Sequence, residues 1–252
     1  MQPTTPTKRT CVFCGGQPTT REHIFSPKWV ADLTSTQEAY TGDFFRQAED
    51  GTVQREQWAN RDGAGGVVRC ACATCNNGWM QELDTAAREA VTPLARGEAG
   101  TVSANGVRLV STWAAKIAIV MDSMWGPEIL DRALKESFRK TLEPPETWTV
   151  WATAMNPTRP RTRLRGVTLT AEAEADVPQA YFASFSVLHL IVQVFCPLID
   201  GVVFRRSDGY ERHTVRLWPS PPRLRWPPPD EVALSTEKEF TALTLAVVAA
   251  RP

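Results

Sequence analysis

Two short stretches, Cys11-Val12-Phe13-Cys14-Gly15 and Cys72-Ala73-Thr74-Cys75-Asn76, decide how the N-terminal part of the chain folds. Each contains a Cys-x-x-Cys knuckle, whose two-residue spacer lets one tight turn present two thiolates to the same metal ion. Zinc prefers four tetrahedral thiolate or imidazole ligands, so two knuckles complete one closed site. We therefore predict one structural Zn²⁺ ion on Cys11, Cys14, Cys72 and Cys75. Four thiolates leave no open position for a substrate, so this zinc is expected to hold loops together.

The other two cysteines are expected to lie outside the metal site. Cys70 alternates with Cys72, and we choose Cys72 as the ligand because its spacing to Cys75 repeats that of the first knuckle. Cys196 lies in an apolar segment and is predicted to be a buried core thiol. A redox pair would not need a second knuckle. The polar segment 1–10 has no apolar stretch typical of a signal peptide, so we expect the reducing cytoplasm, where paired cysteines favour metal binding over disulfides.

Helical and strand periodicities follow the second knuckle and indicate an α+β chain. Apolar residues recur at helical spacing from Trp79 to Ala95, and Gly97 provides a stop. We expect a helical zone from about 107 to 142 and a strand-rich zone from about 147 to 218. The expected helices are a broad-faced helix ending at Gly126, a helix opened by Pro127 and a last helix from Thr236 to near Ala249. Strands are expected at 147–155 and 163–170, and 181–195 is expected to form one long or two short strands. A hairpin turn at 207–209 is expected to join Val202–Arg206 to Arg212–Leu217, and an extended strip to follow at 218–229.

The balance of charge limits the classes of partner. The 252 residues include 28 basic and 28 acidic ones, so the formal net charge is zero. No global basic field drives non-specific nucleic-acid binding, and any such binding needs a local patch. The best candidate patch is the alternating set Arg159, Arg161, Arg163 and Arg165, and an ordinary exposed strand face is the alternative. The longest apolar stretch, 180–196, contains polar residues and is too short for a membrane span, so no membrane contact is expected.

The segment Arg21-Glu22-His23-Ile24-Phe25-Ser26-Pro27 lies between the knuckles. A Cys-x-x-Cys pair, an acidic-His-Ile segment followed by proline, and a second Cys-x-x-Cys followed directly by Asn76 thus occur in that order. This order resembles the HNH endonuclease superfamily, in its zinc-knuckle branch, over about residues 11–88. The continuation Asn77-Gly78-Trp79-Met80 also resembles the helix start of that family. The resemblance implies a ββα-metal, treble-clef-like fold and hydrolysis of nucleic-acid phosphodiester bonds, with DNA favoured over RNA.

Site roles are carried over from this resemblance by position. His23 corresponds to the general base that activates water, and Glu22 and Asn76 correspond to ligands of a catalytic divalent cation, Mg²⁺ or Mn²⁺. The chemistry is coherent, because a neutral imidazole with a pKa of about 6.5 accepts a proton from water near neutral pH. Hard cations such as Mg²⁺ accept oxygen ligands from a carboxylate, an amide and a phosphate.

The sequence departs from the family pattern at three points. The stretch Gly65–Arg69 lacks the usual middle Asn, and Asn60 lies further upstream. The last position is Asn76 where the family often has His. The long gap between His23 and Cys72 predicts an insertion between the two finger strands. These departures leave open a second interpretation, a catalytically inactive zinc module that binds nucleic acid or protein and uses His23 structurally.

Together these features predict an α+β protein of two domains. Residues 1–97 are expected to form the HNH-like zinc-bearing domain. Residues 101–252 are expected to form an α+β domain with a helix pair and a mainly antiparallel sheet, to which the sequence assigns no role.

Four further side chains are expected to serve structure. His189 lies in an apolar run and is predicted to be a hydrogen-bonded core residue, whereas His213 is predicted to lie on a solvated face. Trp218 and Trp226, each followed by proline, are expected to pack against the proline strip, and base stacking is the alternative.

Overall fold

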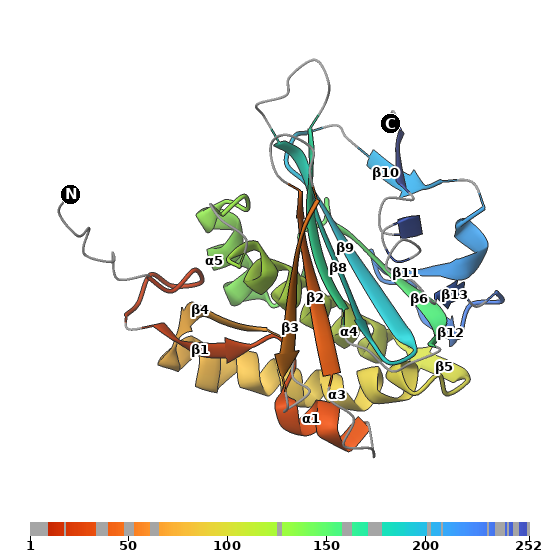
Figure 1. Ribbon diagram of the computed structural model, residues 1–252, viewed down its shortest axis with the longest axis horizontal. Helices are drawn as coiled ribbons and strands as arrows, with labels where there is room; N and C mark the ends of the chain where they lie inside the picture. Colours follow the sequence, from red (N-terminus) through yellow and green to blue (C-terminus); the bar gives the residue numbers. More distant parts are fainter. Residues whose placement is uncertain are drawn as a thin grey trace.

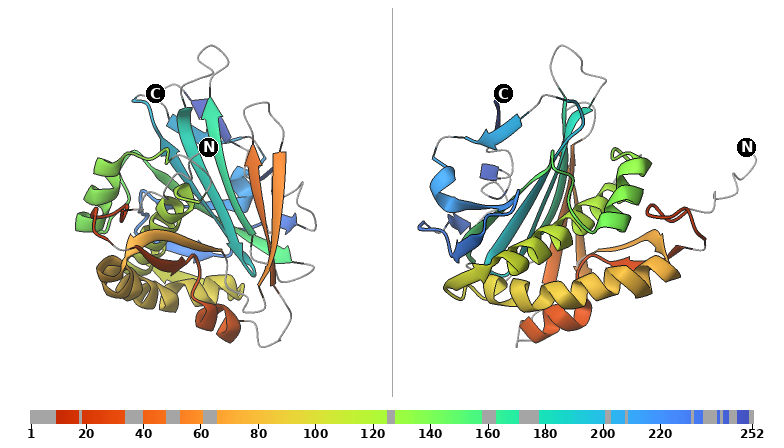
Figure 2. Two further views of the ribbon diagram at one scale, coloured as in Figure 1. Left: turned by 60° about the vertical axis from the view of Figure 1, so that its left-hand side comes forward. Right: turned by 180° about the vertical axis from the view of Figure 1, so that it is seen from behind.

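The structure is a computed structural model and describes residues 10–17, 19–33, 40–47, 53–60, 66–124, 128–157, 163–170, 178–200, 203–207, 209–230, 232–234, 240, 242–243 and 247–250. Helices and antiparallel strands are mixed along the chain, which confirms the α+β class. Figure 1 shows a twisted sheet behind which a long helix, α4 (Ala104–Asp122), crosses, while α3 (Gln81–Ala95) runs along the base of the molecule. Seen from behind in Figure 2, α4 lies between the sheet and α3.

The main sheet has six strands, and its antiparallel order is β11-β6-β9-β8-β7, with β13 pairing in parallel with β6. The predicted apolar segment 181–195 forms a hairpin of β8 and β9 within it. Every residue of β9 from Leu190 to Cys196 is buried, because both faces of the sheet are covered. The strand bounds are β6 Thr149–Pro157, β7 Arg163–Thr170, β8 Pro178–Val187, β9 Leu190–Pro197, β11 Thr214–Trp218 and β13 Val232–Leu234.

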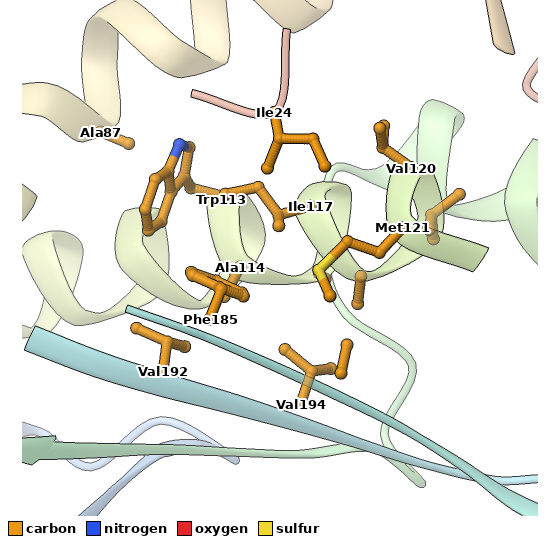
Figure 3. Packing of buried hydrophobic residues seen from close by; sticks show 14 of the residues in the cluster. Ile24, Ala87, Trp113, Ala114, Ile117, Val120, Met121, Phe185, Val192 and Val194 are labelled. Atoms are coloured by element: carbon orange, nitrogen blue, oxygen red, sulfur yellow. The ribbon is translucent and has the colours of Figure 1, made fainter. Parts of the chain in front are cut away.

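Helix α4 is the centre of the core and is buried on all sides from Gly106 to Asp122, apart from the exposed Arg108 and the half-buried Leu109. Ser103 caps its first turn by accepting a hydrogen bond from the Gly106 N–H. Figure 3 shows its apolar side chains between β8 and β9 on one side and the N-terminal part on the other; the labelled residues are Ile24, Ala87, Trp113, Ala114, Ile117, Val120, Met121, Phe185, Val192 and Val194. Each fully buried aliphatic side chain contributes about 1.5–3 kcal/mol.

Polar side chains on this buried helix each have a partner, as burial requires. Ser111 donates to the Leu217 carbonyl, and Thr112 donates to the Leu142 carbonyl. Asp122 accepts from the backbone of Ile129 and Leu130 and pairs with Lys135 at 2.7 Å. These bonds orient α5 (Arg132–Thr141) against the C-terminal end of α4.

The N-terminal part is a small finger built on a two-stranded antiparallel sheet of β1 (Thr19–His23) and β4 (Val67–Cys72). The segment between these strands holds α1 (Pro27–Leu33) and the hairpin β2–β3 (Tyr40–Gln47 and Val53–Asn60), so the predicted insertion is present. A short helix α2 (Ala73–Cys75), a π-helical turn η1 (Asn76–Met80) and α3 follow β4 directly. The finger therefore has a strand–strand–helix order.

Short elements complete the fold. β5 (Gly100–Ser103) pairs with β12 (Arg223–Trp226), so the proline-rich strip is extended as predicted and contains a strand. β10 (Val203–Arg206) pairs with β14 (Val247–Ala250), and a 3₁₀ turn, η3 (Glu211–His213), precedes β11.

Three sequence expectations about the C-terminal part are wrong. The last helix is present at Phe240, Ala242 and Leu243, but it was expected to continue to near Ala249, and residues 247–250 form β14 instead; its predicted cap at Thr236 and Glu239 lies outside the described residues. The expected hairpin is absent, because β10 pairs with β14 and β11 pairs with β6. The helix expected to open at Pro127 begins instead at Arg132, where Asp131 caps it by accepting from the Ala133 N–H.

The core continues across the predicted boundary between the two parts. One hydrophobic cluster includes Phe25 and Trp29 from the N-terminal part together with Trp113 and Phe185. The ring centroids of Phe25 and Phe185 are 5.8 Å apart, and those of Trp29 and Trp113 are also 5.8 Å apart. The division into two domains stays a prediction, and these rings lie where the two parts meet. Among the helices that the structure describes, none combines the length and apolar character needed to cross a bilayer.

Candidate metal centre

The first knuckle is a tight turn closed by its own backbone. The Gly15 N–H donates to the Cys11 carbonyl at 2.7 Å, and the Cys11 N–H donates to the Gly16 carbonyl at 2.9 Å. Gly15 has φ +73°, a left-handed conformation that glycine adopts without strain. Gly16 lies against the sulfur atoms, since a Cβ there would lie 3.3 Å from the Cys14 Sγ. The turn thus directs both thiols of the knuckle to the same side.

The second knuckle is formed where β4 ends and the helical segment begins. Cys72 is the last residue of β4 and has an extended backbone, and Cys75 follows one helical turn later. The Val12 N–H donates to the Cys70 carbonyl at 2.9 Å, which fixes the first knuckle against β4. The two turns therefore face each other although they are far apart in sequence.

Four sulfur atoms converge between the knuckles. The Sγ atoms of Cys11, Cys14, Cys72 and Cys75 all lie within 4.8 Å of one another, and those of Cys14 and Cys72 are 3.5 Å apart. A zinc ion with four Zn–S bonds of about 2.3 Å would separate its sulfur ligands by about 3.8 Å, so this donor set fits a tetrahedral Zn²⁺ ion. All four cysteines are free thiols. Among the described residues this is the group of cysteine, histidine and carboxylate side chains that could hold a metal ion.

The surroundings of these thiols give them different pKa values. Burial raises the pKa of the Cys11 thiol and raises that of Cys75 to about 12. Burial also acts to raise the pKa of Cys72, but the Cys75 backbone N–H and the neighbouring thiols lower it to about 7. A metal ion bound here must therefore displace protons from the other thiols, which makes its affinity depend on pH.

The remaining cysteines lie outside the cluster. Cys70 is 2% exposed and burial raises its pKa. It belongs to the same strand as Cys72, and the neighbouring core includes Val68 and Ala71. Cys196 is fully buried in β9, as the sequence predicted, and burial raises its pKa as well.

His23 is the last residue of β1 and is half-buried opposite Val67 of β4. A register shift between Thr20 and Glu22 interrupts the regular alternation of the strand. Because successive side chains of a strand point to opposite faces, His23 points away from the interior to which Glu22 turns. Its imidazole is therefore presented at the end of the strand nearest to the segment Ile24–Ser26.

Glu22 is 5% exposed and faces the core, where its carboxylate meets Lys116 of α4 at 3.5 Å. The Lys116 ammonium is 2.8 Å from Asp84 Oδ1 and 3.0 Å from Oδ2. Burial raises the pKa of Glu22, and the charge of Asp84 adds to this, while Lys116 acts in the opposite direction. Burial lowers the pKa of Lys116, but the two carboxylates together raise it above its usual value. The sequence analysis did not identify this cluster, whose only signal is a lysine within the apolar face of the predicted helix.

Asn76 joins the helical segment to β1. Its amide nitrogen donates to the Thr20 hydroxyl at 3.0 Å and to the Arg21 carbonyl at 3.1 Å. The amide oxygen is the acceptor that remains for a cation. Glu22 does not fit this second role, because its carboxylate is buried beside an ammonium group. Thus the structure brings the four cysteines together, whereas Glu22 and Asn76 make their polar contacts with different parts of the molecule.

A small cleft adjoins the buried charge cluster and the segment after His23. Asp84 and Arg88, one helical turn apart on α3, face it, and the Arg88 Nε atom has no hydrogen-bond partner. The cleft is lined by Ile24, Phe25, Ser26, Trp29, Asp84, Arg88, Val91 and Trp113.

The candidate arginine patch and the remaining histidines can also be placed. Arg163 and Arg165 belong to β7, and Arg159 and Arg161 lie outside the described residues. His189 forms a hydrogen bond through Nδ1 with the Met155 carbonyl at 3.0 Å, but it lies half-buried in the turn between β8 and β9, so its predicted position in the core is wrong. No family model, curated protein or solved structure matches the chain.

Proposed function

We propose that this protein is an HNH-type endonuclease that hydrolyses nucleic-acid phosphodiester bonds, with DNA as the favoured substrate and His23 as general base. One observation carries the proposal: a pair of antiparallel strands is followed directly by a helix, the four-cysteine cluster joins them, and the half-buried His23 ends the first strand. This order and placement support the resemblance that the sequence shows between residues 11 and 88.

In this proposal the metal of the cysteine cluster is a structural Zn²⁺ ion. Four thiolates fill a tetrahedral shell, so the ion cannot bind water or substrate. Its role is to fix β1 relative to α3 and thereby the place of His23. We expect the zinc-loaded protein in the reducing cytoplasm, where thiols stay available to metal.

Hydrolysis requires a group that accepts a proton from the attacking water. A histidine imidazole titrates near neutral pH, and general-base assistance is typically worth about 10²–10⁴ in rate. The resemblance also implies a catalytic Mg²⁺ or Mn²⁺ ion. Asn76 Oδ1 suits such an ion, whereas Glu22 pairs with Lys116, so we assign Glu22 first to the fold.

The Glu22 pairing also favours a second candidate function, a zinc module that binds nucleic acid or protein without cleaving it. A carboxylate held by a buried ammonium group serves stability, and the sequence lacks the middle Asn of the family pattern. In this alternative His23 has a structural role only.

A plasmid-nicking assay separates the two candidates. Purified protein with one zinc per chain is incubated with supercoiled DNA in Mg²⁺ or Mn²⁺. We expect His23→Ala to lower the rate by about 10²–10⁴ while zinc content and melting profile stay close to wild type. His213→Ala is the matched control, because this partly exposed imidazole contacts the Asp230 carbonyl far from the cluster.

Two results would decide against the nuclease. Equal nicking by wild type and His23→Ala would show that the activity does not depend on this histidine. Absence of nicking by zinc-loaded wild type on DNA and on RNA would favour the binding module.

A further inference from the structure

β12 lies at the end of the molecule away from β1 and β4 (Figure 1), and a groove is lined by residues of β11, β12 and the proline strip. Three of its lining residues are arginines: Arg216, Arg223 and Arg225, all exposed to solvent. Its described lining includes no aspartate or glutamate and is otherwise apolar. The complete lining is Ala99, Val215, Arg216, Pro221, Arg223, Leu224, Arg225, Trp226, Pro227, Pro228 and Pro229.

The backbone holds these guanidinium groups in a fixed arrangement. Along β12, Arg223 and Arg225 alternate with the buried Leu224 and Trp226, so both arginines lie on the same side, about 6.8 Å apart along the strand. Pairing with β5 fixes this strand at each residue. Arg216 belongs to β11, which pairs with β6 of the main sheet.

Within the part of the chain that the structure describes, no ion pair joins Arg216, Arg223 or Arg225 to a carboxylate. The ion pair described nearest in sequence joins Arg212 to Asp230 at 2.9 Å, and it takes up the carboxylate that follows the proline strip. The chain as a whole has zero net charge, so three arginines in one groove form a local excess. A guanidinium group presents its donors in a planar fork that matches the oxygen atoms of a phosphate.

We propose that this groove binds the backbone of a single-stranded nucleic acid, an inference that rests on the proposed nuclease function and names a substrate-holding surface for it. The arginines contact phosphates, and the proline and leucine wall contacts sugars and unstacked bases. A duplex turns its bases inward and offers this wall no apolar partner. Trp226 is 1% exposed and supports the wall from below.

The segment that follows His23 lines a cleft with Asp84 and Arg88 in the middle of α3, whereas the lining of the groove begins at Ala99, beyond the end of that helix. A strand seated in the groove is thus held at a distance from the scissile bond. The surface acts on affinity and on the placement of the substrate, and it contributes no group to the chemical step.

Binding is measured by fluorescence anisotropy with a labelled single-stranded DNA oligonucleotide, without added Mg²⁺ or Mn²⁺, so that no cleavage is needed for the readout. Arg223→Gln/Arg225→Gln is compared with Arg139→Gln/Lys140→Gln, which removes two exposed positive charges from α5. The groove variant is expected to bind at least roughly tenfold more weakly and to lower the slope of log K against log salt by about 1.4, since each lost phosphate contact on a single strand accounts for about 0.7. The α5 variant is expected to behave like wild type, and both are expected to melt like it.

Several results would overturn the inference. These are equal binding by the two double variants, no binding of single-stranded DNA or RNA by wild type, and equally tight, arginine-dependent binding of a polyglutamate peptide, which would make the occupant an acidic protein segment. If wild type nicks plasmid in Mg²⁺ but the groove variant binds single-stranded DNA as tightly as wild type, the groove proposal fails and the nuclease proposal stands. If the groove arginines are needed to bind DNA but the protein never cleaves it, the groove proposal stands and the nuclease proposal fails.

Discussion

The finger and the main sheet are stabilised in contrasting ways. In the finger, two short strands and a helix start meet at four sulfur atoms that all lie within 4.8 Å of one another. In the sheet, β8 and β9 are buried on both faces, and α4 packs many apolar side chains against them. The finger thus depends on four cysteine sulfur atoms that can share one metal ion, whereas the sheet depends on the burial of many apolar side chains. The finger should respond to metal, acid and single-atom changes, whereas the sheet should respond to changes of volume.

The largest effect is expected from loss of the metal ligands. In Cys72→Ser the zinc should be lost and the finger should unfold, because structural zinc supplies about 10–16 kcal/mol in small zinc domains. The β6, β8 and β9 strands should remain ordered, since their core needs no thiol. Zinc per chain by elemental analysis and amide NMR spectra measure the two effects. Cys70→Ala is the control, and full zinc in Cys72→Ser with none in the control would show that the ligand choice is wrong.

The second effect tests the buried charges that join the two regions. Lys116→Met leaves Glu22 and Asp84 without their shared cation in the interior, which is expected to cost about 3–5 kcal/mol of unfolding free energy. Chemical denaturation measures this loss, with the exposed Lys140→Met as control. Adding Glu22→Gln to Lys116→Met should recover part of the stability. If Lys116→Met and Lys140→Met had the same free energy of unfolding, the buried ion pairs of Lys116 would contribute nothing to stability.

A smaller effect tests whether the regions unfold together. Phe25 contributes the ring that approaches both Trp113, at 6.1 Å, and Phe185, at 5.8 Å. Phe25→Leu keeps most of the volume and should cost about 1 kcal/mol. Zinc release and loss of sheet structure should shift to lower denaturant concentration by the same amount. A shift in zinc release alone would mean that the finger is an independent unit, as the division near residues 97–101 predicts.

The smallest effect is a dependence on pH. Because the pKa of Glu22 is raised in the folded state, folding favours its protonated form. The stability that protonated Glu22 adds to the folded state is fully present below the unfolded pKa of about 4.3 and is lost as pH rises through the folded pKa. Glu22→Gln lacks this titration, so its stability relative to wild type should increase with pH over that window. Denaturation at a series of pH values gives the difference, and a constant or decreasing difference would contradict the raised pKa.

The local chemistry of the finger was predictable from sequence, whereas its buried charges were not. The spacing of Cys72 and Cys75 fits one helical turn, and two such turns identify a metal site without knowledge of the fold. Glu22 and Lys116 are 94 residues apart, and their meeting depends on the register of β1 and on the packing of α4. No local pattern reports such a meeting.

The same distinction explains the errors in the C-terminal part. Residues near Thr236 and Glu239 form a local helix-capping pattern, but Val247 and its neighbours are also good strand residues. Pairing between Arg206 and Val247 decides in favour of the strand. The predicted hairpin failed for the same reason, since β10 pairs with a segment about 40 residues away. For β8 and β9 the sequence predicted strand structure in 181–195 and left open one long or two short strands, and the direct pairing of the two strands decides for two.

The separation of the two knuckles has a consequence for how the protein is made. Cys14 and Cys72 are 58 residues apart. At synthesis rates of about 5–20 residues per second, the first knuckle waits roughly 3–12 seconds before the second has been added to the nascent chain. During that interval Cys11 and Cys14 offer only half of a tetrahedral shell, while the insertion with α1 and the β2–β3 hairpin is being synthesised. Because Cys75 precedes α4 and the main sheet in the sequence, the complete set of four thiols is available to a metal ion before those elements have been synthesised.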